Sequence, residues 1–150
     1  MFGMVIASSS PAVAARCAHA RAGVGAVASQ NVTDPALGPR VLDLMAGGAH
    51  APEAVARVTA KAAFAEYRQI LAVDAAGRTA VQSGARALGI WSTAEGPGVA
   101  AGGNLLADPG VPQAMIDGFL AAGGAFGDRL VAALRAGLAA GGEAGPVHSA

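Results

Sequence analysis

Polar side chains close two short apolar runs near the start of the sequence. They are Ser8, Ser9 and Ser10 after the run at 2–7, and Ser29, Gln30 and Asn31 at the end of the run at 22–29. Side chains and backbone N–H groups at such strand ends can surround the carbonyl oxygen of a bound substrate and form an oxyanion hole. The same residue types also close turns by bonding their own backbone. From the residues alone, a pocket and a pair of turns are both open interpretations.

The next residues with chemical potential are Cys17 and His19. On a strand these two side chains would share a face and could form a nucleophile and its base, whereas on a helix they would diverge. A small buried thiol beside an exposed histidine is the commoner arrangement, and we adopt it. Because Cys17 is the one cysteine, we expect no internal disulfide and a reducing, cytoplasmic location.

The familiar cofactor and metal motifs are absent. The three histidines share no ligand spacing, and one cysteine cannot build a thiolate site, so no metal is expected. The "GVGAVA" stretch lacks the third glycine of a dinucleotide site, and the sequence has neither a phosphate-binding loop nor a Gly-x-Ser-x-Gly elbow. We therefore predict that the protein uses no cofactor.

Composition narrows the class of partner. The net charge is +0, from 10 basic and 10 acidic residues, which argues against binding to nucleic acid or an anionic membrane. No window reaches the roughly 18 uninterrupted apolar residues of a membrane helix. With 53% hydrophobic and 13% charged residues, the 150-residue chain should fold as one domain, 1–150.

The expected elements alternate between strands and helix pairs. The pattern predicts strands at 2–7 and 22–29, helices at 37–48 and 51–64, and a hairpin over 68–84 turning at 75–77. It also predicts further strands of the same sheet at 88–93 and 98–106, and helices at 108–122 and 127–142. Apolar strands with helix pairs on either side indicate an α+β fold, with strands between two helical layers.

Several ordered motifs carry a family resemblance over nearly the whole chain. They are "FGMVIASSS" at 2–10, "AGVGAVASQ" at 22–30, Arg68-Gln69, Ser83-Gly84, Gly103-Asn104, "VPQAM" at 111–115 and "LVAALRAGLAAGG" at 130–142. In this order they resemble domain-of-unknown-function family 1028, a family similar to the N-terminal-nucleophile (Ntn) hydrolases. The resemblance implies an αββα sandwich and hydrolysis of a small amide or peptide-like substrate. A Thr, Ser or Cys at the mature terminus would attack the amide carbonyl, with its own α-amine as base.

The resemblance also implies a substrate-binding site. Its expected residues are Ser8, Ser9, Ser10, Gln30, Asn31, Arg68, Gln69 and Asn104. Family members carry the candidate nucleophile on an additional N-terminal strand, and Phe2 after Met1 would block methionine removal here. We therefore assign no catalytic residue, and expect an incomplete sandwich that is inactive in this form. The alternative is a non-catalytic binding or assembly module, most simply a homodimer formed through exposed strand edges.

Overall fold

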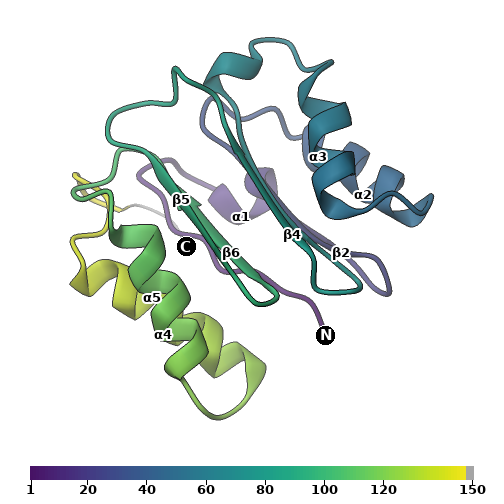
Figure 1. Cartoon of the computed structure of the whole chain (residues 1–150). Helices are drawn as coiled ribbons and strands as arrows, with labels where there is room; N and C mark the ends of the chain where they lie inside the picture. The colour runs from purple at the N-terminus through teal and green to yellow at the C-terminus, as the bar shows by residue number, and fades with distance from the viewer. Residues whose placement is uncertain (148–150) are drawn as a thin grey trace.

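The computed structural model describes residues 1–147 of the 150-residue chain. This part forms a mixed α+β fold with antiparallel strands and five α-helices (Figure 1). The elements are α1 (Val13–Cys17), β1 (Ala18–Arg21), β2 (Gly25–Gln30), α2 (Leu37–Ala46), α3 (Ala51–Thr59), a 3-10 turn η1 (Ala65–Tyr67), β3 (Gln69–Asp74), β4 (Thr79–Ser83), β5 (Ser92–Gly96), β6 (Val99–Gly103), α4 (Val111–Ala121) and α5 (Phe126–Ala139).

The larger sheet has the strand order β1-β2-β3-β4, with every neighbouring pair antiparallel. Alternate residues along a strand face opposite sides of a sheet, so each strand contributes side chains to both faces of the larger sheet. On one face Val27 and Ile70 are fully buried against α2 and α3. Helix α2 meets them with Val41 and Met45, whose four-residue spacing produces one apolar helix face. This is the main hydrophobic core.

The opposite face of the larger sheet packs against the two-stranded sheet β5–β6. The approach is close because Gly102 of β6 lies against Leu71 of β3, where an added Cβ would come within 2.9 Å of Leu71 Cδ2. Helix α4 covers the β5–β6 hairpin, and α5 packs beside α4. The order of layers is therefore helix pair, larger sheet, hairpin and helix pair, with α2–α3 and α4–α5 on opposite sides in Figure 1.

Most predicted elements are confirmed, with shifts of a few residues at their ends. The strand at β2, the β3–β4 hairpin and helices α2 to α5 all form where the pattern placed them. The hairpin turns at residues 75–77, where Gly77 takes the left-handed φ of 79°. These elements depend on local signals, namely apolar periodicity and turn residues, which is why the sequence reveals them.

Two expectations were wrong, and two elements were not predicted. Residues 2–7 form no helix or strand, and the sequence pattern gave no sign of α1 or β1. The strands predicted at 88–93 and 98–106 form at 92–96 and 99–103, and they build a separate sheet instead of extending the first. An apolar run indicates that a strand can form, but tertiary packing decides which other strand it pairs with. The N-terminal segment packs on α5 instead, with Gly3 against the Phe126 ring.

Candidate functional site

A large cavity opens on the face of the larger sheet that points away from α2 and α3. Its volume is about 880 Å³, within the usual range for small-molecule sites. One wall is the outward face of β2 and β3, including Ala28, Gln30 and Leu71. The N-terminal segment, β6 and the α4–α5 pair provide the remaining walls. The lining is apolar apart from a few polar side chains.

Six of the eight residues predicted for the site line this cavity: Ser8, Ser9, Ser10, Gln30, Asn31 and Asn104. Hydrogen bonds bring their segments together around residues 102–106, at the end of β6. Gln30 bonds to the carbonyl of Gly102, and Asn31 bonds to Leu88, whose carbonyl accepts from Leu105. Ser9 bonds to Glu143, which forms a β-bridge with Leu106.

Gln30 and Gln69 form a polar ladder with Ser83 across three strands. The three residues are direct partners in the register of β2, β3 and β4. Gln30 Nε2 donates to Gln69 Oε1 at 2.6 Å, and Gln69 Nε2 donates to Ser83 Oγ at 2.6 Å. The second hydrogen of each carboxamide NH₂ reaches β6, at the carbonyl oxygens of Gly102 and Gly103, both at 3.2 Å. The ladder therefore attaches the larger sheet to the end of β6, and it uses all four N–H donors.

Asn31 and Arg68 also make internal contacts. Asn31 is buried at a left-handed φ of 58°, a conformation that asparagine tolerates better than most residues. Its Nδ2 donates to the Tyr67 carbonyl at 2.6 Å, and its Oδ1 accepts from the Leu88 N–H at 3.3 Å. Arg68 is buried outside the cavity lining, and its Nε donates to the Ala63 carbonyl at 3.2 Å. Both side chains brace loops that surround the site.

Asn104 differs from the other predicted site residues. It follows directly after the two glycines whose carbonyls the ladder holds, and it is half-buried in the cavity lining. Its carboxamide makes no hydrogen bond with any of residues 1–147. A carboxamide presents a donor and an acceptor side by side. Asn104 thus has a donor–acceptor pair that no described residue uses, at a position in the cavity lining.

The serines lie on the N-terminal segment. Ser9 donates its backbone N–H to Glu143 Oε2 at 2.9 Å and its hydroxyl to Glu143 Oε1. Ser8 Oγ accepts the N–H of Ser10 at 3.0 Å, a local turn contact. The sequence gave no signal for Glu143, because its partner is 134 residues away along the chain.

Cys17 and His19 do not form a nucleophile–base pair. Cys17 is buried at the end of α1, with its Sγ 3.4 Å from Thr33 Oγ1. His19 is on β1, and its ring packs on Gly38 of α2 so closely that a Cβ there would come within 2.1 Å of His19 Cδ2. His19 Nε2 is buried without a hydrogen-bond partner in the described part of the chain. The buried thiol agrees with the expectation, whereas His19 is half-buried rather than exposed.

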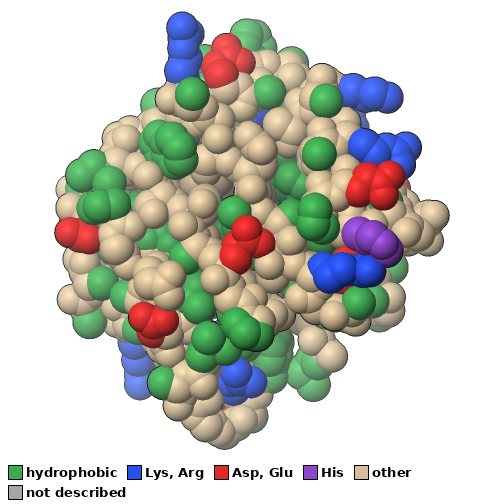
Figure 2. Space-filling view, in the orientation of Figure 1, with side chains coloured by type: hydrophobic (Ala, Val, Ile, Leu, Met, Phe, Trp, Pro, Cys, Tyr) green, Lys and Arg blue, Asp and Glu red, His purple; other side chains and the backbone are tan. Residues whose placement is uncertain are grey.

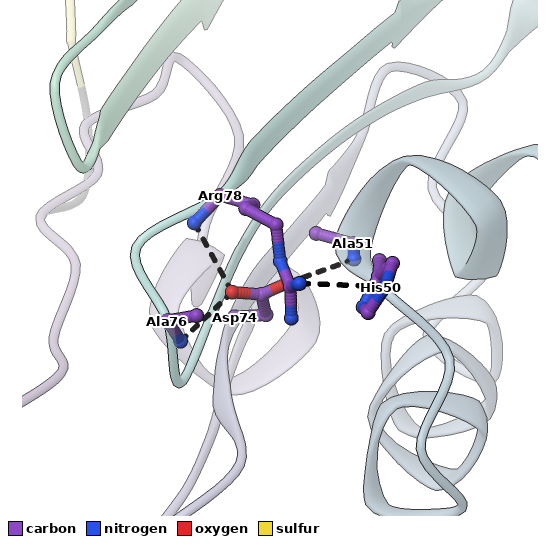
Figure 3. Close-up of polar contacts among 5 residues, drawn as sticks. All are labelled: His50, Ala51, Asp74, Ala76 and Arg78. Atoms are coloured by element: carbon purple, nitrogen blue, oxygen red, sulfur yellow. Dashed lines mark hydrogen bonds and ion pairs between the residues drawn. The ribbon is translucent and has the colours of Figure 1, made fainter.

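A second polar cluster, which the sequence did not reveal, centres on Asp74 at the end of β3 (Figure 3). Its carboxylate accepts N–H bonds from Ala51 at 3.1 Å, Ala76 at 2.9 Å and Arg78 at 3.1 Å, and an ion pair from Arg78 Nε at 2.7 Å. Burial alone would raise the pKa of Asp74, but Arg78 and the three backbone donors outweigh it and hold that pKa below its ordinary value of 3.8. Asp74 thereby fastens the β3–β4 turn to the start of α3.

Charges elsewhere are dispersed. Figure 2 shows acidic and basic side chains scattered singly or in small mixed groups over the face drawn there. Within residues 1–147, no three His, Cys, Asp or Glu side chains lie close enough together to hold a metal ion. No helix in that range has the length and apolar character needed to cross a membrane.

The sequence profile of a family described as "Family of unknown function (DUF1028)" matches residues 1–150. The chain belongs to this family. A crystal structure of another DUF1028 protein, SPO2555 from Silicibacter pomeroyi, superposes with a TM-score of 0.86 at 34% sequence identity. The match covers 90% of this chain and 60% of that chain, so this DUF1028 sequence spans about three fifths of the length of SPO2555. No curated protein matches the sequence.

Proposed function

We propose that the cavity is the substrate-binding site of an amide hydrolase of the Ntn type, which acts on a small amide. The free carboxamide of Asn104 is the observation that carries the proposal. An amide substrate presents one N–H donor beside one C=O acceptor, which is the complement of what Asn104 offers. Asn104 is half-buried, so water can reach its carboxamide, and a polar ligand that replaces this water can use the donor and the acceptor together.

The surroundings of Asn104 support the same proposal. The Gln30–Gln69 ladder fixes the two carbonyls that precede it, which limits the positions available to the Asn104 backbone. Rigid support of this sort is what a binding group requires. The layer order, with two sheets between two helix pairs, is also compatible with an αββα sandwich of the Ntn type. We leave the catalytic nucleophile unassigned, since Ser9 and Cys17 are already bonded to Glu143 and Thr33.

The test is release of ammonia or amine from a panel of acyl amides by the full-length gene product, meaning these residues together with any others that the gene encodes, because these 150 residues alone are expected to be inactive. We expect turnover, and we expect Asn104→Ala to lower kcat/KM about tenfold, the effect of losing a neutral hydrogen-bonding partner. The free energy of unfolding should stay unchanged, because the Asn104 side chain bonds to no described residue. Gln113→Ala is the matched control, since that carboxamide is exposed on α4 and bonds to Asp117. If the protein hydrolyses none of the amides in the panel, the proposal is refuted.

A further inference from the structure

The cavity is too large and too apolar for a small amide alone. At about 880 Å³ it approaches the upper end of the range for small-molecule sites. Its deep walls are hydrocarbon, from Leu71 on β3, Ile116 and Phe119 on α4, and Phe126 and Leu130 on α5. Leu71, Ile116 and Phe119 are nearly inaccessible to water, whereas Phe126 and Leu130 keep part of their surface accessible. An apolar group that displaces water from this accessible part would gain free energy in proportion to the area covered.

Apolar side chains also continue from the interior to the surface. Val32, Leu88 and Leu105 line the cavity and yet remain 50%, 43% and 38% exposed, respectively. Leu88 and Leu105 are joined by a backbone hydrogen bond of 2.9 Å, and Leu105 adjoins Asn104. The opening of the cavity thus combines an apolar edge with the free carboxamide. A ligand that enters here would meet a polar group at the opening and hydrocarbon further in.

The charged side chains of the cavity lining favour a ligand whose polar end is uncharged. Among the described residues of the lining, these side chains are Arg16, Asp74 and Glu143. The Asp74 carboxylate is occupied by four N–H donors, and Glu143 is bonded to Ser9. Arg16 is exposed on α1. A carboxylate or phosphate drawn into the cavity would find no buried cation, and burying an unpaired charge is strongly unfavourable.

We propose that the cavity binds amides of medium-length apolar acyl chains, with the amide at Asn104 and the chain directed between β3 and the α4–α5 pair. This inference rests on the proposed function, because it names the substrate class of the same site. It adds two requirements that hydrolysis alone does not impose, an apolar chain and an uncharged head.

Calorimetric titration with butanamide, hexanamide and octanamide tests the proposal without any need for turnover. We expect affinity to rise about fourfold per methylene group, as for hydrocarbon moved from water into an apolar site. Octanoate, which differs from octanamide in the charge of its head, should bind at least tenfold more weakly at pH 7, because a carboxylate offers Asn104 no N–H donor and loses part of its hydration at this half-buried position without gaining a cation.

Filling the cavity provides the structural test. Ala28→Phe places a ring on the β2 face that lines the cavity, away from α2 and α3, and should weaken octanamide binding at least twentyfold. Leu130→Trp narrows the cavity from α5 and should act similarly if Ala28→Phe fails to fold. Ala56→Phe, on the exposed side of α3 and outside the cavity, is the matched control and should bind as the wild type does.

The outcomes separate the two proposals. Binding that depends on chain length and is lost on filling, without hydrolysis by the full-length protein, would support the ligand class and refute the hydrolase. Hydrolysis of short amides, with affinity independent of chain length, would support the hydrolase and overturn this inference. Equal binding of octanoate and octanamide, or full binding by both filled variants, would also overturn it.

Discussion

Replacing Gln69 with leucine should lower the free energy of unfolding by about 3 kcal/mol, since several buried polar groups lose their partners at once. Gln69 is fully buried, accepts from Gln30, and donates to Ser83 and to the Gly103 carbonyl. Leucine is similar in size but supplies neither donor nor acceptor. The substitution should also weaken amide binding, because the carbonyl that precedes Asn104 is no longer held. Urea-induced unfolding, monitored by circular dichroism, gives the change in stability.

Gln82→Leu is the matched control for that experiment. Gln82 is the residue before Ser83 on β4, and within residues 1–147 its side chain makes one hydrogen bond, of 3.4 Å to the Ser83 carbonyl. The same chemical change at this half-buried position should cost less than about 1 kcal/mol. Equal losses for the two variants would show that the ladder contributes no special stability, and the positioning of β6 would need another explanation.

Asp74→Asn should lower the free energy of unfolding at pH 7 by about 2–3 kcal/mol. The carboxylate is 3% exposed and accepts four bonds, two of them from Arg78. An asparagine NH₂ would turn donors toward donors, and Arg78 would lose its charged partner. The affected contacts join the β3–β4 turn to α3 (Figure 3), so the loss should act mainly on the main core, although Asp74 also belongs to the cavity lining.

The pH dependence of the free energy of unfolding shows whether the Asp74 charge causes this loss of stability. Because the folded-state pKa of Asp74 lies below 3.8, its stabilising effect is fully present above about pH 4 and is lost as the pH falls through the lowered value. Wild-type stability should therefore fall more steeply than that of Asp74→Asn below pH 4. Asp43→Asn serves as the control, because Asp43 is 67% exposed in its pair with Arg21 and should change stability by less than about 0.5 kcal/mol. Parallel pH profiles for wild type and Asp74→Asn would contradict this account.

The sequence pattern predicted helices α2 to α5 and the β3–β4 hairpin because each of these elements contains its own apolar periodicity or turn residues. Val41 and Met45 recur at helical spacing, and Gly77 marks the turn. Helix α1 has no such signal: it is five residues long and follows Ala12, which takes a left-handed φ of 57°. The separate β5–β6 sheet was also unpredictable from its own Ala- and Gly-rich residues. It is placed by close packing of Gly102 on Leu71 and by side chains from the other sheet.

The residues of the candidate site were likewise predicted only in part. The motif order pointed to Gln30, Asn31 and Asn104, and all three line the cavity. Residue type could not distinguish the carboxamides that brace the fold from the one left free, since that depends on partners distant in sequence. Asn31 bonds to Tyr67 and Leu88, whereas Asn104 has no partner among the described residues. Glu143 and Asp74 were missed for the same reason, because their partners are brought to them by folding.

The most direct test is nuclear magnetic resonance of the side-chain carboxamides during titration with octanamide. The chain has six such groups, at Gln30, Asn31, Gln69, Gln82, Asn104 and Gln113, so each NH₂ signal can be assigned by substitution. We predict that the Asn104 signal shifts most, that Gln30 and Gln69 shift less because their donors already hold β6, and that Gln113 on α4 does not move. A saturable shift at Asn104 that disappears in Ala28→Phe would support an amide site at this position. An unchanged Asn104 signal at saturating octanamide, or equal shifts at Asn104 and Gln113, would contradict it.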